Sequence, residues 1–319
     1  MTTYKEIFGK YVKNYSSDPS SDIEGQVWYN STTGVFKTNL NLGKAWSSGG
    51  NLGTARYGHG GAGTQTAGLA IAGYTGTVNI ANTEEYDGSA WTAGGNVGTA
   101  RRALGGAGTQ TTGLGFGGYS TANTNATEEY DGSAWTGGGN MGTARRYPAG
   151  CGLQTAGLAF AGVTTANSNA TEEYDGSAWT AGGNMGTARY ILGACGTQTA
   201  GLAFGGLTTV ITNATEEYDG SVWTGGGNLT TARRSLGGAG TQTAGLGFGG
   251  FTTVNVNNTE EYNGTSWTAS GNMVTTRRGV VGAGTQTVAL GFGGLTTAAT
   301  AATEEYTDPT FSTKTITTS

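Results

Sequence analysis

Six Glu-Glu pairs recur along the 319-residue chain, and paired carboxylates could in principle act as a general acid and a general base. Neighbouring side chains in a strand point to opposite faces of the sheet, so a pair such as Glu84-Glu85 would be divided rather than convergent. An active site is normally unique, whereas this pair is present in every repeat. We therefore predict that the pairs are structural and bond to six repeated arginines, Arg56, Arg101, Arg145, Arg189, Arg233 and Arg277, as interblade ion pairs or hydrogen bonds.

Other residues that could do chemistry are few. Cys151 and Cys195 occupy the same repeat position, where alanine stands in the other repeats, which indicates small buried side chains rather than a disulfide or a metal site. The Gly-rich segment 113–118 resembles a phosphate loop only superficially, because no helix is expected after it. We predict no cofactor, no bound metal and no enzymatic activity.

The aromatic residues indicate which elements position these groups. Tryptophan recurs every 44 residues after a first interval of 45, and tyrosine follows the same 44-residue period from Tyr86 to Tyr306. A period in this range is typical of propellers and solenoids. No segment has a helical hydrophobic pattern, and Gly, Thr and β-branched residues dominate, so helical repeats are excluded. The tryptophans predicted to fill the gaps between repeats are Trp46, Trp91, Trp135, Trp179, Trp223 and Trp267.

Each repeat divides into four short strands. In the repeat that starts at Arg101, we expect strands near 103–109, 113–118, 127–130 and around Trp135. Asp-Gly between the third and fourth strands is a strong hairpin signal, since glycine accepts a positive φ without penalty. Small residues in the first two strands fit the crowded centre of a radial array. The pattern predicts an all-β propeller.

At these residues the chain resembles the kelch family of β-propellers. The matching features are a double glycine that ends the second strand, as in Gly117-Gly118 and Gly249-Gly250, a later tyrosine, a tryptophan five residues on, and an arginine before the next first strand. The resemblance covers about residues 40–311 and implies a kelch-type fold. Galactose oxidase is an enzyme of this type, but its histidine and tyrosine copper ligands cannot be supplied by a chain whose only histidine is His59.

The number of blades follows from the chain ends. We favour seven blades, in which 25–30 and 38–46 supply a degenerate first blade and 312–319 closes the ring, with Phe311 in the tryptophan register of the last full repeat. The alternative is six blades, in which Trp46 inserts into the last blade and the terminal strands lie outside it. The expected domains are an N-terminal attachment segment at 1–22 and the propeller at 23–319.

Composition excludes several classes of function. The formal net charge of −5 and the isoelectric point near 5.0 do not suit a nucleic-acid binder, which needs clustered cations. No stretch approaches the ~20 apolar residues of a membrane span, and no secretory signal is visible at the start. We expect neither nucleic-acid binding nor membrane insertion.

Differences among the repeats predict a binding face. They concentrate in the loop between the second and third strands and in the triplet after the repeated arginine, which should lie on one face of a four-stranded blade, opposite the uniform turns. Loops accept substitutions wherever no other part of the protein packs on them, so variation in a loop does not by itself indicate binding. The triplets lead into inner strands, however, and still contain Arg, Tyr and His, so we predict binding by Tyr57, His59, Arg102, Arg146, Tyr147, Tyr190, Arg234 and Arg278.

The two ends suggest a biological setting. The segment 24–37 (EGQVWYNSTTGVFK) looks like a short hairpin common near the start of bacteriophage tail-fibre proteins, and the whole chain resembles kelch-like structural proteins of marine phages. This resemblance implies a virion protein that is assembled in the host cytoplasm in multiple copies per particle. It would attach to other virion proteins through the N-terminal segment and touch a host-surface polysaccharide or receptor through the variable face. The alternative is an intracellular kelch-type adaptor that binds a protein partner.

Overall fold

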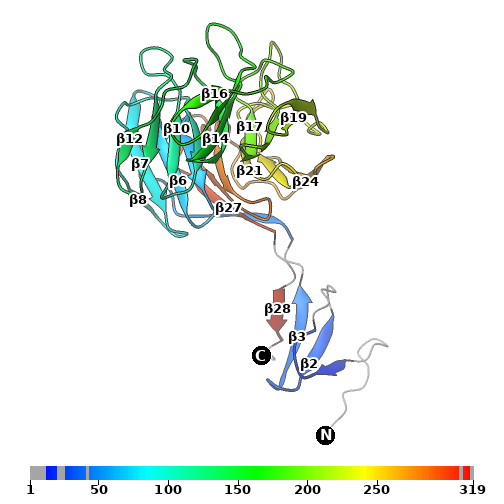
Figure 1. Ribbon diagram of the computed structural model, residues 1–319. Helices are drawn as coiled ribbons and strands as arrows, with labels where there is room; N and C mark the ends of the chain where they lie inside the picture. The colour runs from blue at the N-terminus through cyan, green and yellow to red at the C-terminus, as the bar shows by residue number, and fades with distance from the viewer. Residues whose placement is uncertain (1–11, 20–25, 41–42, 309–311, 317–319) are drawn as a thin grey trace. The chain divides into compact units, whose positions relative to one another are not determined.

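The computed structural model describes residues 12–19, 26–40, 43–308 and 312–316, and every regular element in these ranges is a β-strand. The chain forms two compact units. One comprises Ala45–Thr307, and the other combines Met1–Lys44 with Asp308–Ser319. Figure 1 shows the strands of both units, which are described separately below.

The larger unit is a β-propeller of six four-stranded antiparallel sheets. The inner strands are β5 (Gly60–Gly63), β9 (Gly105–Gly108), β13 (Ala149–Leu153), β17 (Gly193–Thr197), β21 (Gly237–Gly240) and β25 (Val281–Gly284). The second strands are β6 (Gly68–Tyr74), β10 (Gly113–Phe116), β14 (Ala156–Phe160), β18 (Ala200–Phe204), β22 (Gly245–Phe248) and β26 (Val288–Phe292). The third strands are β7 (Asn79–Tyr86), β11 (Thr127–Tyr130), β15 (Thr171–Tyr174), β19 (Thr215–Tyr218), β23 (Thr259–Tyr262) and β27 (Thr303–Thr307). The outer strands are β8 (Trp91–Ala93), β12 (Trp135–Gly137), β16 (Trp179–Ala181), β20 (Trp223–Gly225), β24 (Trp267–Ser270) and β4 (Ala45–Ser48). The prediction of an all-β propeller is confirmed.

The ring closes with six blades, which is the alternative rather than the favoured count of seven. Each inner strand contacts the next, and β25 contacts β5, so no gap is left for another blade. The last blade takes its outer strand from β4, where Trp46 pairs with Tyr306. The expected pairing of 38–40 with Trp46 in one blade is wrong, because these residues belong to different sheets. The sequence motif around Trp46 fits either arrangement. In the structure, β4 pairs with the edge of β27, whose backbone hydrogen-bonding groups would otherwise be exposed.

The smaller unit is a single sheet in the order β1-β2-β3-β28. It contains β1 (Lys13–Tyr15), β2 (Val27–Asn30), β3 (Val35–Leu40) and β28 (Ser312–Thr315). The expected hairpin between 24 and 37 and the pairing of the C-terminal strand with the N-terminal region are both confirmed. The unit boundaries, at 44/45 and 307/308, differ from the expected boundary at 22/23. Phe311 and most of 1–22 lie outside the described residues.

Glycine at the propeller centre is required by the approach of neighbouring inner strands. A Cβ atom at Gly282 would lie 2.2 Å from the carbonyl oxygen of Gly238, and one at Gly238 would lie 2.4 Å from that of Ala194. Real Cβ atoms do not approach this closely, so larger residues would force the inner strands apart. Six strands can therefore meet around a narrow axis only because this position is glycine or alanine.

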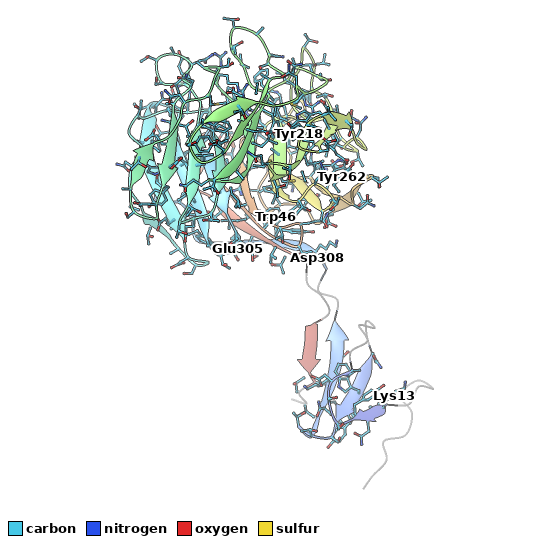
Figure 2. The ribbon with its side chains drawn as sticks, viewed as in Figure 1. Lys13, Trp46, Tyr218, Tyr262, Glu305 and Asp308 are labelled. Atoms are coloured by element: carbon cyan, nitrogen blue, oxygen red, sulfur yellow. The ribbon has the colours of Figure 1, made fainter. Side chains whose placement is uncertain are left out.

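Each tryptophan packs between two blades, as predicted. The ring centroid of Trp179 lies 4.9 Å from Tyr174 in its own blade and 5.0 Å from Phe116 in the preceding blade. Its Nε1 donates to Thr127 Oγ1 of the preceding blade at 2.9 Å. Trp46 makes the same contacts, with Tyr306 and Phe248, and Figure 2 shows it among the propeller side chains. The tryptophans thus hold neighbouring blades together through apolar contact and one hydrogen bond each.

The Glu-Glu pairs are divided between two structural roles. The first glutamate meets the repeated arginine: Arg189 is fully buried, and its Nη1 donates to Glu216 Oε1 at 2.8 Å. The second glutamate accepts from the tyrosine of the following blade, as when Tyr218 Oη donates to Glu173 Oε1 at 2.5 Å. Burial and this bond raise the pKa of Tyr218 to about 12, so the phenol remains a donor. The glutamates are structural, as predicted, but the expected interblade position of the Arg–Glu bond is wrong, because Arg189 precedes β17 and Glu216 lies in β19 of the same sheet. The bond between neighbouring blades is made by the tyrosine, which was not predicted.

The uniform turns also connect blades or close hairpins. Gln154 in the first hairpin of its blade donates from Nε2 to the carbonyl oxygens of Gly113 (3.0 Å) and Tyr130 (2.8 Å) in the preceding blade. In the Asp-Gly turn, Asp131 Oδ1 accepts from the backbone N–H groups of Ser133 and Ala134, each at 2.8 Å. These bonds explain why both turns keep their sequence in nearly every repeat.

Candidate binding site

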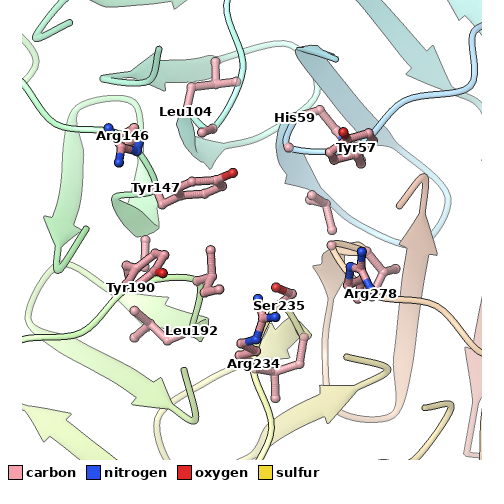
Figure 3. Close-up of a pocket in the computed structure, with 18 of the residues that line it drawn as sticks. Tyr57, His59, Leu104, Arg146, Tyr147, Tyr190, Leu192, Arg234, Ser235 and Arg278 are labelled. Carbon is pink, nitrogen blue, oxygen red and sulfur yellow. The ribbon is translucent and has the colours of Figure 1, made fainter. Parts of the chain in front are cut away.

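The variable triplets converge on one cavity at the propeller axis, which we call the axial pocket. Its volume is about 590 Å³, and it is lined by residues of all six triplets. Figure 3 shows arginine, tyrosine and serine side chains arranged around its wall. Seven of the eight predicted binding residues line it: Tyr57, His59, Arg146, Tyr147, Tyr190, Arg234 and Arg278. The eighth, Arg102, lies outside this lining and borders an adjoining cavity of about 340 Å³ with Arg146 and Tyr147.

The convergence follows from the position of each triplet just before an inner strand. The first triplet residue bridges to the residue after the Gly-Gly or Ala-Gly pair of its own blade, as in Arg146 with Val163. The middle residue then takes a left-handed conformation, with φ of 55° at Tyr147 and 49° at Ile191. This turn directs the chain into the inner strand, so six equivalent turns surround the axis.

The arginines of the variable face are cations without carboxylate partners. In the described part of the chain, none of Arg102, Arg146, Arg234 and Arg278 forms an ion pair. All four are half-buried. Their charge is therefore available to a ligand, and the absence of a carboxylate in the lining makes the axial pocket electropositive.

Asparagines of the variable loops hold three of these arginines. Asn123 Oδ1 accepts from Arg146 Nη1 at 3.3 Å, and its Nδ2 donates to the carbonyl oxygen of Val163 at 3.1 Å. In the same way, Asn79 Oδ1 accepts from Arg102 Nη1, and Asn255 Oδ1 accepts from Arg278 Nη1. These asparagines join the loop of one blade to the next.

His59 reaches the pocket lining but does not present its polar atoms to it. The side chain is 4% exposed, and neither ring nitrogen has a hydrogen-bond partner among the described residues. It lies against Phe292 of the preceding blade, with ring centroids 5.4 Å apart. Leucine, proline or valine occupies the same position in the other five blades. Burial lowers the pKa of His59 to about 3, helped by the nearby charge of Arg56, so it is a neutral packing residue at physiological pH.

Among the pocket residues that were not predicted from the sequence are Ile191 and Ser235. Both occupy the middle of their triplets. The prediction considered only Arg, Tyr and His side chains and therefore did not include them. Two other triplets have glycine at the same position, Gly58 and Gly279, and this pattern was the sequence signal that could have identified Ile191 and Ser235. Glycine there indicates a left-handed turn, and a larger residue at such a position needs an explanation.

The described residues form neither a metal-binding cluster nor a reactive thiol site. They contain no group of three His, Cys, Asp or Glu side chains placed to bind a metal. Cys151 and Cys195 are free and buried, and burial raises the pKa of Cys151 to about 12, as for an unreactive thiol. No helix among the described residues is long and apolar enough to cross a membrane.

Comparisons with known proteins give no further assignment. The chain matches none of the protein-family models, and no curated protein matches it in sequence.

Proposed function

We propose that this chain is a non-enzymatic, kelch-type propeller of a bacteriophage virion whose axial pocket binds an acidic polysaccharide of the host surface. The observation that carries the proposal is the composition of that pocket. Three half-buried arginines, Arg146, Arg234 and Arg278, line it together with three tyrosines, and no carboxylate does. Cations and aromatic rings in one concave site suit a ligand that has negative charge and flat apolar surfaces.

The distribution of charge over the propeller supports an anionic ligand. The protein is acidic overall, with a net charge of −5, yet its pocket face carries the unpaired arginines. The Asp-Gly turns at the other end of the blades carry exposed carboxylates, including Asp87, Asp131 and Asp175. Such a separation would orient the propeller, with its pocket leading, toward a negatively charged surface.

The chain ends support attachment through the smaller unit. Strands from both ends of the sequence, β1 to β3 and β28, form one sheet, so both connections to the propeller start from it. The resemblance of its hairpin to those of phage tail-fibre proteins gives the virion setting. In this proposal the smaller unit joins other virion proteins, and many copies per particle provide avidity for a repetitive polymer.

The pocket role is tested by neutralising its charge. A variant with Arg146, Arg234 and Arg278 each replaced by Gln is compared with the wild type on an array of acidic and neutral polysaccharides. We expect loss of acidic-glycan binding with a melting temperature within a few degrees of wild type. The matched control, Asp87, Asp131 and Asp175 each replaced by Asn, should bind normally.

Two further measurements separate the alternatives. Binding of a polyglutamate peptide in preference to every glycan would favour the intracellular adaptor instead. Mass spectrometry of purified virus particles from the source should detect the chain, and its absence from them would refute the virion role.

A further inference from the structure

The axial pocket has two unlike halves, because the middle triplet residues differ around the ring. These six residues share φ values between 49° and 64°: Gly58, Ala103, Tyr147, Ile191, Ser235 and Gly279. Three consecutive blades contribute Tyr147, Ile191 and Ser235, and the other three contribute only glycine or alanine. At this position, one side of the pocket therefore carries larger side chains and the other only glycine or alanine.

Three blades keep a larger residue at this position, although glycine would adopt the left-handed conformation without strain. A left-handed conformation costs a non-glycine residue about 1–2 kcal/mol, and a β-branched residue such as Ile191 rarely adopts it. Backbone strain of this kind concentrates at functional sites. Because glycine occupies the same position in two sibling blades, the turn itself does not need a larger side chain. The extra side chains of Tyr147 and Ile191 thus point to contact with a ligand.

A pair of unneutralised cations lies on one part of the wall. The guanidinium carbon of Arg234 lies 4.7 Å from the ring centroid of Phe251, and that of Arg278 lies 4.9 Å from the same centroid. Both arginines also line the axial pocket, so an anion bound there would be attracted by two positive charges. Figure 3 shows Ser235, a further possible donor, beside Arg234.

Arg234 differs from its siblings in having free donors. Arg102, Arg146 and Arg278 each donate to an asparagine of the preceding blade, whereas the equivalent position before Arg234 is Ile211. Within the described ranges, no residue accepts a hydrogen bond from the Arg234 guanidinium. Its planar set of N–H groups matches the two oxygens of a carboxylate.

Aromatic rings form the neighbouring part of the wall. The centroids of Tyr147 and Tyr190 lie 6.0 Å apart with their planes inclined by 48°. Both rings are half-buried at the pocket. Burial raises the pKa of Tyr147, so its hydroxyl stays protonated and can donate while the ring face offers apolar contact.

We infer that the axial pocket binds one carboxylate-bearing sugar residue, a uronic-acid type unit, at a chain end or branch of the polymer. Its carboxylate lies on Arg234, Arg278 and Ser235, and its ring packs against Tyr147 and Tyr190. An end or branch fits because, toward the inner strands, the axial pocket adjoins only a smaller cavity of about 140 Å³, lined by inner-strand glycines and by apolar side chains that both cavities share. This inference rests on the proposed function and specifies the ligand for the same site.

The test is isothermal titration of the full chain with two probes, a galacturonic acid tetramer and a neutral galactose tetramer. We expect the acidic probe to bind at least tenfold more tightly. Arg234→Gln should weaken it at least tenfold and Arg234→Gln with Arg278→Gln at least a hundredfold, whereas the charge-matched control Lys13→Gln on the smaller unit should stay within twofold. Ser235→Ala, a milder change, should weaken it about threefold, and melting temperatures check that each variant is folded.

The outcomes separate the two levels of the proposal. If the wild type binds no glycan at all, the proposed function fails. If it binds the acidic tetramer but Arg234→Gln behaves like Lys13→Gln, the pocket assignment is overturned while glycan binding stands. Equal affinity for the neutral tetramer, or stronger binding of sulfated dextran than of the uronate, would overturn the carboxylate subsite.

Discussion

Replacement of His59 by Leu should stabilise the propeller and remove part of its acid sensitivity. His59 is 4% exposed, its two ring nitrogens have no partner in the described structure, and Arg56 and Arg277 lie near enough to disfavour a second positive charge. Leucine is the residue at the same position in three other blades, at 104, 192 and 236. The substitution therefore places a residue that this fold already accepts at an equivalent site.

The magnitude follows from the pKa difference between the two states. The pKa is about 3 in the folded protein and 6.5 for the unperturbed side chain. Above pH 6.5 both states are neutral and the histidine has no pH-dependent effect. Below 6.5 the unfolded chain binds a proton that the folded protein does not, so stability falls until the pH approaches 3. At pH 4.5 this loss amounts to roughly 3 kcal/mol.

The assay is thermal unfolding of wild type and His59→Leu from pH 8 to pH 3.5. The difference between the two melting temperatures should be small at pH 8 and grow to about 5 °C at pH 4.5. The reciprocal variant Leu104→His should gain the acid sensitivity that His59→Leu loses. A constant difference between wild type and His59→Leu at all pH values would refute the assignment of His59 as a buried neutral residue.

Three further substitutions test the buried ion pair, the interblade tryptophan and the strained turn. Glu216→Gln leaves the buried Arg189 without its counter-charge and should lower the free energy of unfolding, measured by chemical denaturation, by about 3–5 kcal/mol. The control Asp219→Asn at an exposed turn should leave the denaturation midpoint unchanged. Equal effects of the two substitutions would contradict a buried ion pair. Trp223→Ala should cost about 3–5 kcal/mol, and a wild-type unfolding curve would show that the ring is not an interblade packing residue. Ile191→Gly relieves about 1–2 kcal/mol of backbone strain against a smaller entropic cost, so stability should hold or rise while affinity for the uronate falls; a clear loss of stability would make Ile191 a packing residue instead.

Periodicity determines the blade from sequence because each blade is built from local signals. Asp-Gly marks the outer hairpin, small residues mark the inner strands, and one tryptophan per 44 residues marks the interblade gap. The same periodicity places the triplets on one face, which is why most of the predicted binding residues meet in the axial pocket. These features depend on contacts within a blade or between adjacent repeats.

The tertiary structure alone decides how the ring closes. Trp46 carries the outer-strand motif, and that motif is compatible with a degenerate first blade or with the last blade. The choice depends on a pairing between residues at opposite ends of the propeller, Trp46 with Tyr306, and on six inner strands completing a circle. No local signal encodes either condition.

The chemical state of the pocket residues is also a property of the assembled blades. His59 and Arg234 both belong to the variable triplets, yet one is buried against Phe292 and the other presents its donors to the cavity. Their difference arises from neighbours contributed by the preceding blade, Phe292 for the histidine and Ile211 in place of an asparagine for the arginine. Sequence determines which residues vary, and the packing of adjacent blades decides which of them a ligand can reach.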